Sequence, residues 1–68
     1  MEPDSVVVCR SFSTLAEAEL AIGALVAYGI DAAYRRGHGL HLATTFDVLV
    51  REDDVAAALD VLGTEQAQ

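Results

Sequence analysis

Two histidines lie three residues apart in the stretch RRGHGLHL, which spans residues 35–42. Imidazole nitrogen is a common zinc ligand, so His38 and His41 are the residues of this chain best suited to bind a metal. A tetrahedral site usually needs four ligands, and only Asp47 and Cys9 are available to complete it, neither at a recognised spacing. We therefore predict no metal site and no cofactor, and His38 and His41 are the residues that would take part if a metal did bind.

The sequence also lacks a pattern of catalytic groups. Cys9 lies inside an apolar run, with no neighbouring base to activate its thiol. Gly37 and Gly39 form a G-x-G, but no helix follows whose N-terminus could receive a phosphate. The acids at 52–54 match the first turn of a helix, where the helix dipole favours negative charge. We predict no catalytic and no cofactor-binding residues, and a binding protein rather than an enzyme.

Arginine is the remaining residue type with recognition chemistry. If the strands alternate regularly, Arg10, Arg35 and Arg51 share the outward face of a sheet. Guanidinium groups there would bind carboxylates, phosphates or an acidic partner. The alternative is cross-strand pairing with Asp31 and Asp47 on the same face, and we favour this second interpretation.

Three strands and two helices are expected to position these residues. The apolar, β-branched run of residues 5–10 predicts a strand, and alternation predicts two more over residues 30–35 and 46–51. Residues 36–45 then form a long hairpin connection. The first helix begins with the T-x-x-E capping box of Thr14 and Glu17, buries a stripe that includes Leu25 and Val26, and ends at Gly29. The second helix begins at residue 52 and ends at Gly63.

The order β-α-β-β-α predicts an α+β fold, a ferredoxin-like sandwich that lacks the fourth strand. In this arrangement the third strand is central in an antiparallel or mixed three-stranded sheet, and both helices cover one face. The domain spans residues 5–63, with polar tails at 1–4 and 64–68. The first strand becomes an edge, although it is the most apolar strand of the chain. Since natural proteins cover such edges, we expect an interface, and a homodimer, at Val6, Val7, Val8 and Cys9.

Several segments resemble a known family. These are EAEL at residues 17–20, YGI followed by Ala32, and a V-x-V strand that runs through Asp54 into the second helix. The chain resembles, over roughly residues 5–63, the bacterial domain-of-unknown-function family labelled prokaryotic signal transducing protein. The resemblance implies a truncated relative of PII-type signalling proteins, with no established catalytic residues. Arg51, where many relatives carry proline, and the histidine-bearing hairpin depart from the family pattern.

Charge and composition restrict the partners. The net charge of −7 comes from 11 acidic residues against four arginines, which argues against nucleic acid or an anionic membrane as a partner. No apolar run reaches the roughly 20 residues of a membrane span, and the first residues are acidic where a signal peptide is basic. We expect a cytoplasmic protein.

Three hypotheses for function follow. The first is a signalling or regulatory interaction module that acts through a homo-oligomer or through edge-strand pairing. The second is a small-ligand or metal sensor that uses residues 36–45. The third is a structural partner subunit that adds its edge strand to the sheet of a larger protein.

Overall fold

The structure is a computed structural model that describes residues 5–39 and 43–66, with side chains described as far as residue 63. Its elements follow the predicted order. They are β1 (Val6–Phe12), α1 (Leu15–Ala27), β2 (Ala32–His38), β3 (Thr44–Arg51), a short 3-10 turn η2 (Glu52–Asp54) and α2 (Val55–Gln66).

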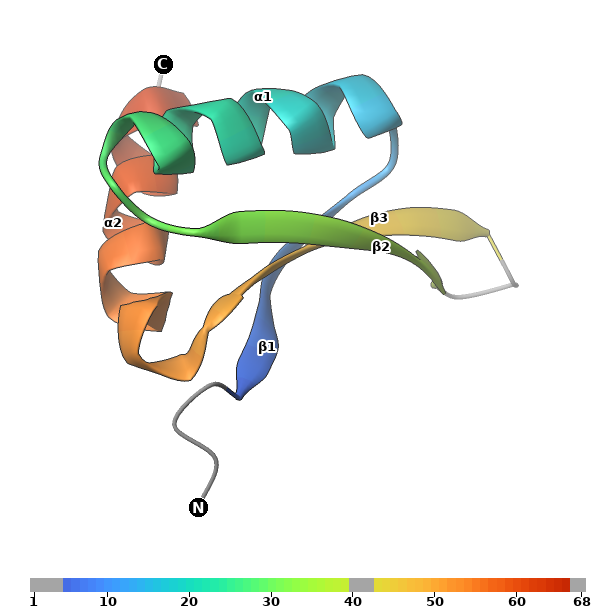
Figure 1. Cartoon of the computed structure of the whole chain (residues 1–68). Helices are drawn as coiled ribbons and strands as arrows, with labels where there is room; N and C mark the ends of the chain where they lie inside the picture. Colours follow the sequence, from blue (N-terminus) through green and yellow to red (C-terminus); the bar gives the residue numbers. More distant parts are fainter. Residues whose placement is uncertain (1–4, 40–42, 67–68) are drawn as a thin grey trace.

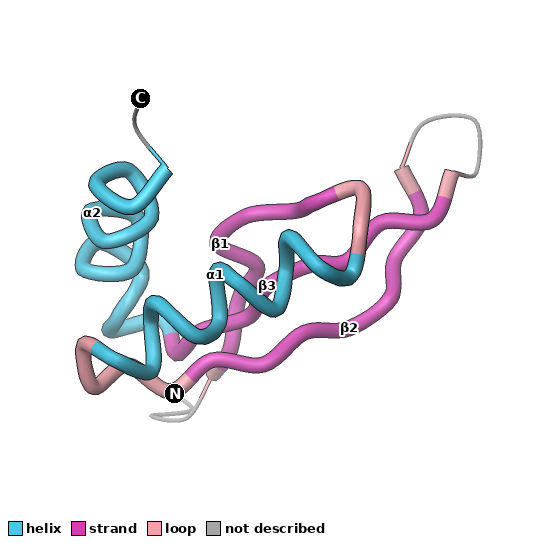
Figure 2. Tube along the Cα trace, turned by 90° about the horizontal axis from the view of Figure 1, so that it is seen from above, coloured by secondary structure: helices cyan, strands magenta, loops and turns pink. Residues whose placement is uncertain are grey.

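The three strands form one antiparallel sheet in the order β1-β3-β2, so the central position predicted for the third strand is confirmed. Because β1 and β2 are both antiparallel to β3, they run parallel to each other, and α1 makes the crossover between them. Figure 1 shows α1 running along one side of the sheet, with α2 beside its C-terminal end. Figure 2, seen from above, shows β3 between the other two strands. The fold is therefore the predicted ferredoxin-like arrangement without a fourth strand.

Local signals define both ends of α1. Thr14 is the N-cap, and its hydroxyl accepts a hydrogen bond from the backbone N–H of Glu17 at 3.2 Å. At the other end Gly29 has a φ of +82°, a left-handed conformation that glycine adopts without steric cost. The N–H groups of Gly29 and Ile30 then donate to the carbonyls of Val26 and Leu25, the two bonds of a Schellman motif.

The core lies between the helices and one face of the sheet. The buried residues of α1 are Ala18, Ala21 and Leu25, a spacing that places them on one helix face. Val26 was expected on this stripe, but it lies one residue beyond Leu25 and points away from the sheet, with 57% of its surface exposed. The other core members come from the segment after α1, from β3 and from α2: Ile30, Val48, Val50, Ala58, Val61 and Leu62.

Several predicted boundaries differ from those of the structure: β1 continues to Phe12, and residues 52–54 form η2, so α2 begins at Val55. Strand pairing continues to His38 and Thr44, so the hairpin connection is only residues 39–43 and not the expected residues 36–45. Each additional cross-strand pair satisfies backbone groups, which favours a short connection. Likewise, Gly63 does not end α2, which continues to Gln66 through part of the predicted tail. Glycine lowers helix stability by only about 1 kcal/mol and no proline follows, so nothing local stops the helix there.

Candidate functional site

The face of the sheet opposite the helices has no covering layer in the described part of the chain (Figure 1). Paired residues of an antiparallel sheet share a face, and side chains alternate along each strand. The register therefore assigns ten residues to this open face: Val6, Val8, Ser11, Ala33, Arg35, Gly37, Thr45, Asp47, Leu49 and Arg51. The open face divides into a polar part around Asp47 and an apolar part around Leu49.

Asp47 is the centre of the polar part, and it is buried although its face is open. The Ser11 hydroxyl donates to Asp47 Oδ1 at 2.7 Å, and the Thr45 hydroxyl donates to the same oxygen at 3.0 Å. On the other side, Arg35 Nε lies 3.7 Å from Asp47 Oδ2. A Cβ at Gly37 would come within 2.5 Å of Oδ2, so the glycine leaves the space that this carboxylate occupies.

These partners favour the ionised form of the carboxyl group. The hydrogen bond from Ser11 is the main cause that lowers the pKa of Asp47, with further contributions from Thr45 and Arg35 that outweigh the opposing effect of burial. All three strands contribute a partner to Asp47, so the network ties the sheet together. A carboxylate whose oxygens already have these partners is better suited to stabilising the sheet than to acid–base chemistry.

The apolar part of the open face borders the free edge of β1. Val6 is 58% exposed and Val8 is 39% exposed. Val8 pairs with the half-buried Leu49, which in turn pairs with the exposed Ala33 of β2. Arg51 pairs with Val6 at the end of this patch, and its Nε lies 3.9 Å from Asp54 Oδ2. We call Val6, Val8, Ala33 and Leu49 the apolar patch.

A β-bulge at Cys9 divides β1. Val8 pairs with Leu49 and Arg10 pairs with Val48, so two residues of β1 oppose one residue of β3 at this point. The bulge changes the alternation and puts Arg10 on the face of Val48, which is the helix side. The expectation that Arg10 lies beside Arg35 and Arg51 on the open face is therefore wrong, because it assumed regular alternation through Cys9.

The predicted interface residues do not all point the same way. Val6 and Val8 lie on the open face, whereas Val7 pairs with the core residue Val50 and lies on the helix side. Cys9 is half-buried and packs against the core. Burial is the main effect that raises the pKa of the Cys9 thiol, so the thiol stays protonated at neutral pH and is a poor nucleophile.

The arginines of the open face have acidic neighbours. Arg35 pairs with Asp47 across the strands, as the favoured interpretation expected. Arg51 pairs with Asp54, the last residue of η2, and not with Asp31. Both arginine side chains are at least half exposed, so solvent screens their charges. Each arginine beside the apolar patch is therefore offset by an acid of the same chain.

The histidine pair is only partly covered by the structure. His38 is the last residue of β2, is exposed, and pairs with Thr44, so it belongs to a strand end and not to a long loop. His41 lies outside the described residues. Among the residues that are described, no three histidine, cysteine, aspartate or glutamate side chains come close enough to hold a metal ion.

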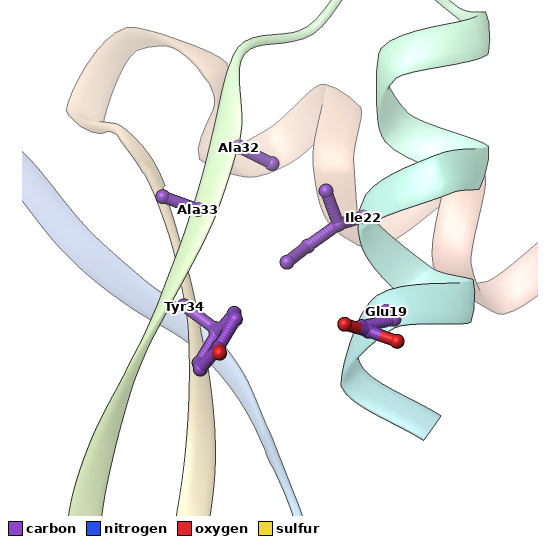
Figure 3. A pocket seen from close by; sticks show the side chains of 5 residues that line it. All are labelled: Glu19, Ile22, Ala32, Ala33 and Tyr34. Carbon is purple, nitrogen blue, oxygen red and sulfur yellow. The ribbon is translucent and has the colours of Figure 1, made fainter. Parts of the chain in front are cut away.

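A cavity of about 390 Å³ lies between α1 and β2, and its lining residues are Glu19, Ile22, Ala32, Ala33 and Tyr34. Figure 3 shows the side chains of Glu19 and Ile22 on α1 and those of Ala32 and Tyr34 on β2 directed into the space between the two elements. Sequence reasoning missed this cavity, because its walls come from a helix and a strand whose separation depends on how they pack. The one available signal is Glu19, an acid only one residue from the buried Ala18.

Comparisons with known proteins leave the family open. No protein-family model matches the chain, and comparisons with curated proteins and with solved structures give no match either. The resemblance to the signal transducing family thus stays a prediction. No helix in the described residues has the length and apolar character that crossing a membrane requires.

Proposed function

We propose that this protein is a small cytoplasmic binding module that works through protein association, and that two copies dimerise through β1 and the apolar patch beside it. The observation that carries the proposal is the exposure of Val6 and Val8 next to Leu49, on an uncovered sheet face at a free strand edge. Exposed apolar side chains that are contiguous at an edge are typical of interaction surfaces.

The local charge supports a second copy as the partner. Two chains of net charge −7 repel each other overall. The charged open-face residues nearest the apolar patch are Arg35 and Arg51, each beside an acid of its own chain. The positive charge of each arginine that borders this patch is therefore offset by an acid of the same chain.

The area of the open face indicates that the dimer interface includes both this face and the edge of β1. Strands spaced about 4.8 Å apart, with about 3.3 Å per residue, give an open face of roughly 14 by 25 Å, or about 350 Å² in projection. A stable interface buries roughly 800 Å² per partner, so the face alone falls short. The edge of β1 has to contribute, and the bulge at Cys9 limits regular strand pairing there to the segment Val6–Val8.

The oligomeric state tests this proposal. Light scattering or sedimentation over micromolar to millimolar concentrations is expected to show a dimer, and Val8→Lys is expected to give a monomer because it places a charge in the apolar patch. Val26→Lys is the matched control, since Val26 is also exposed but lies on α1. A monomer mass for the wild-type chain over the whole range, or equal dissociation by both variants, would contradict the proposal.

A further inference from the structure

The cavity between α1 and β2 has the composition of a subsite for one long side chain. Ile22 and Ala32 provide apolar walls, and the ring of Tyr34, itself packed edge-on against Phe46 with ring centroids 6.3 Å apart, provides an aromatic wall (Figure 3). Its volume of about 390 Å³ is at the lower end of the range for ligand pockets. The cavity is thus large enough for the aliphatic stem of a side chain.

Glu19 supplies the charge of the cavity. Within the described part of the chain, Glu19 forms no ion pair and no side-chain hydrogen bond. An unpaired carboxylate beside aliphatic and aromatic walls suits a cationic group on an apolar stem, because the stem packs on the walls while the charge meets Glu19. Lysine has this chemistry.

A second charge lies further along the same side of β2. Arg36 pairs with Phe46 and Tyr34 pairs with Val48, so Arg36 and Tyr34 are on the same face, two residues apart. Arg36 is exposed and forms no ion pair with Glu19 or with any other described acid. A ligand that spans both positions would therefore meet a negative charge at one and a positive charge at the next.

The backbone beside the cavity is a free strand edge. β2 is the outer strand of the order β1-β3-β2, and no described strand pairs with its other side. Alternate residues of an edge strand direct their N–H and C=O groups outward, where an extended chain can pair with them. The side chains of such a chain alternate with the same two-residue period that separates Tyr34 from Arg36.

We propose that the edge of β2 and the adjoining cavity bind an extended peptide segment by strand addition, with a lysine side chain in the cavity against Glu19 and an acidic side chain beside Arg36. β2 is already antiparallel to β3, and antiparallel pairs are the more common kind. For an antiparallel peptide, the residue opposite Arg36 precedes the residue opposite Tyr34. The recognised pattern is therefore acid-x-lysine in the N-to-C direction.

Two blocked pentapeptides of identical composition test this pattern. One has threonine, glutamate, valine, lysine and threonine in that order, and the other exchanges the glutamate and the lysine. Titration into labelled protein, followed by amide shifts in NMR spectra, is expected to give saturable shifts in residues 32–36 and at Ile22 with the first peptide. Because the exchange removes both ion pairs, the exchanged peptide is expected to bind about two- to thirtyfold more weakly. Equal affinity for the two peptides would overturn the charge pattern.

Variants of the protein distinguish a contact with Glu19 in the cavity from a general effect of the protein's net charge on peptide binding. Glu19→Gln is expected to weaken binding of the first peptide about two- to fivefold. Glu52→Gln removes the same charge at an exposed position in η2 and is expected to leave the affinity unchanged. An absence of shifts at millimolar peptide, shifts confined to β1, or equal effects of both variants would overturn the proposal. The same shifts with pentylamine, and no gain in affinity from the peptide, would overturn strand addition.

The cavity lies at the β2 edge of the sheet, opposite the edge formed by β1, and Ala33 is the one member of the apolar patch that also lines it. The Val8→Lys variant is therefore expected to bind the first peptide with wild-type affinity. A result in which the wild-type chain is monomeric but peptide binding persists would reject only the dimer, and the reverse result would reject only the peptide site.

Discussion

Asp47 is the one charged residue that is buried among those described, and it lies on the face of the sheet without a covering layer. Neighbouring side chains produce that burial: Ser11 and Thr45 donate to one oxygen, and Arg35 lies beside the other. An unpartnered buried carboxylate would be strongly destabilising, so the network is what makes aspartate tolerable at this position. The chain thus stabilises its open face by hydrogen bonds across all three strands.

The lowered pKa of Asp47 predicts a pH dependence of stability. The ionised form is favoured in the folded state, so its contribution is present above the ordinary aspartate pKa of about 3.9 and is lost as the pH falls through the lower, folded-state value. Asp47→Asn is therefore expected to lower the melting temperature at neutral pH, and the difference from wild type is expected to narrow below about pH 4.

Thermal melts between about pH 2 and pH 7 provide the measurement. Asp31→Asn removes the same charge at an exposed position just before β2 and serves as the control. A constant difference between wild type and Asp47→Asn across this range would show that the carboxylate is not the group responsible.

At the scale of the elements, two glycines near helix ends have opposite roles. Gly29 has a positive φ and closes α1. Gly63 lies inside α2, with nothing within 4 Å of the position that a Cβ would take. The same residue type is therefore required at one position and costs stability at the other.

Alanine substitutions are expected to show this difference. Gly63→Ala should stabilise the protein by about 0.5–1 kcal/mol, because alanine is the better helix former. Gly29→Ala should destabilise it by about 1–2 kcal/mol, because the left-handed conformation is unfavourable for alanine. Urea denaturation gives both values. Gly23→Ala in the middle of α1, where a Cβ also meets nothing, is expected to behave like Gly63→Ala. Destabilisation by Gly63→Ala would mean that α2 ends at that residue.

At the scale of the whole molecule, the net charge opposes dimerisation and the apolar patch favours it. The chain carries −7, while Arg35 and Arg51 beside the apolar patch each lie near an acid of the same chain. Long-range repulsion between two copies decreases when salt shortens the Debye length, whereas contact between apolar side chains does not depend on that length. The effect of salt on dimerisation therefore distinguishes an apolar interface from one made by ion pairs.

Dimerisation is expected to tighten when the ionic strength rises from about 0.01 M to about 0.15 M, over which the Debye length falls from about 30 Å to about 8 Å. Sedimentation equilibrium at the two ionic strengths measures the dissociation constant. Weaker association at the higher ionic strength would show that charge pairs, and not Val6 and Val8, hold the copies together.

Much of the fold follows from local signals in the sequence. Thr14 and Gly29 define the ends of α1 through hydrogen bonds made within a few residues. The order of elements, a crossover followed by a hairpin, matches the ferredoxin-like arrangement, in which β3 is the central strand. Such features can be predicted from sequence because each depends on neighbouring residues or on a general rule of topology.

The functional surfaces depend on contacts between distant residues. The bulge at Cys9 moves Arg10 to the helix side, and no local pattern in VVVCR marks it. Extended pairing turns His38 from a loop residue into the end of β2. The cavity beside Glu19 depends on the packing of α1 against β2, and the burial of Asp47 depends on side chains from all three strands. Only the tertiary structure determines such features. Strand register and helix packing depend on the total free energy of the assembled sheet and helices. No single segment contributes enough to that free energy to fix the register or the packing by itself.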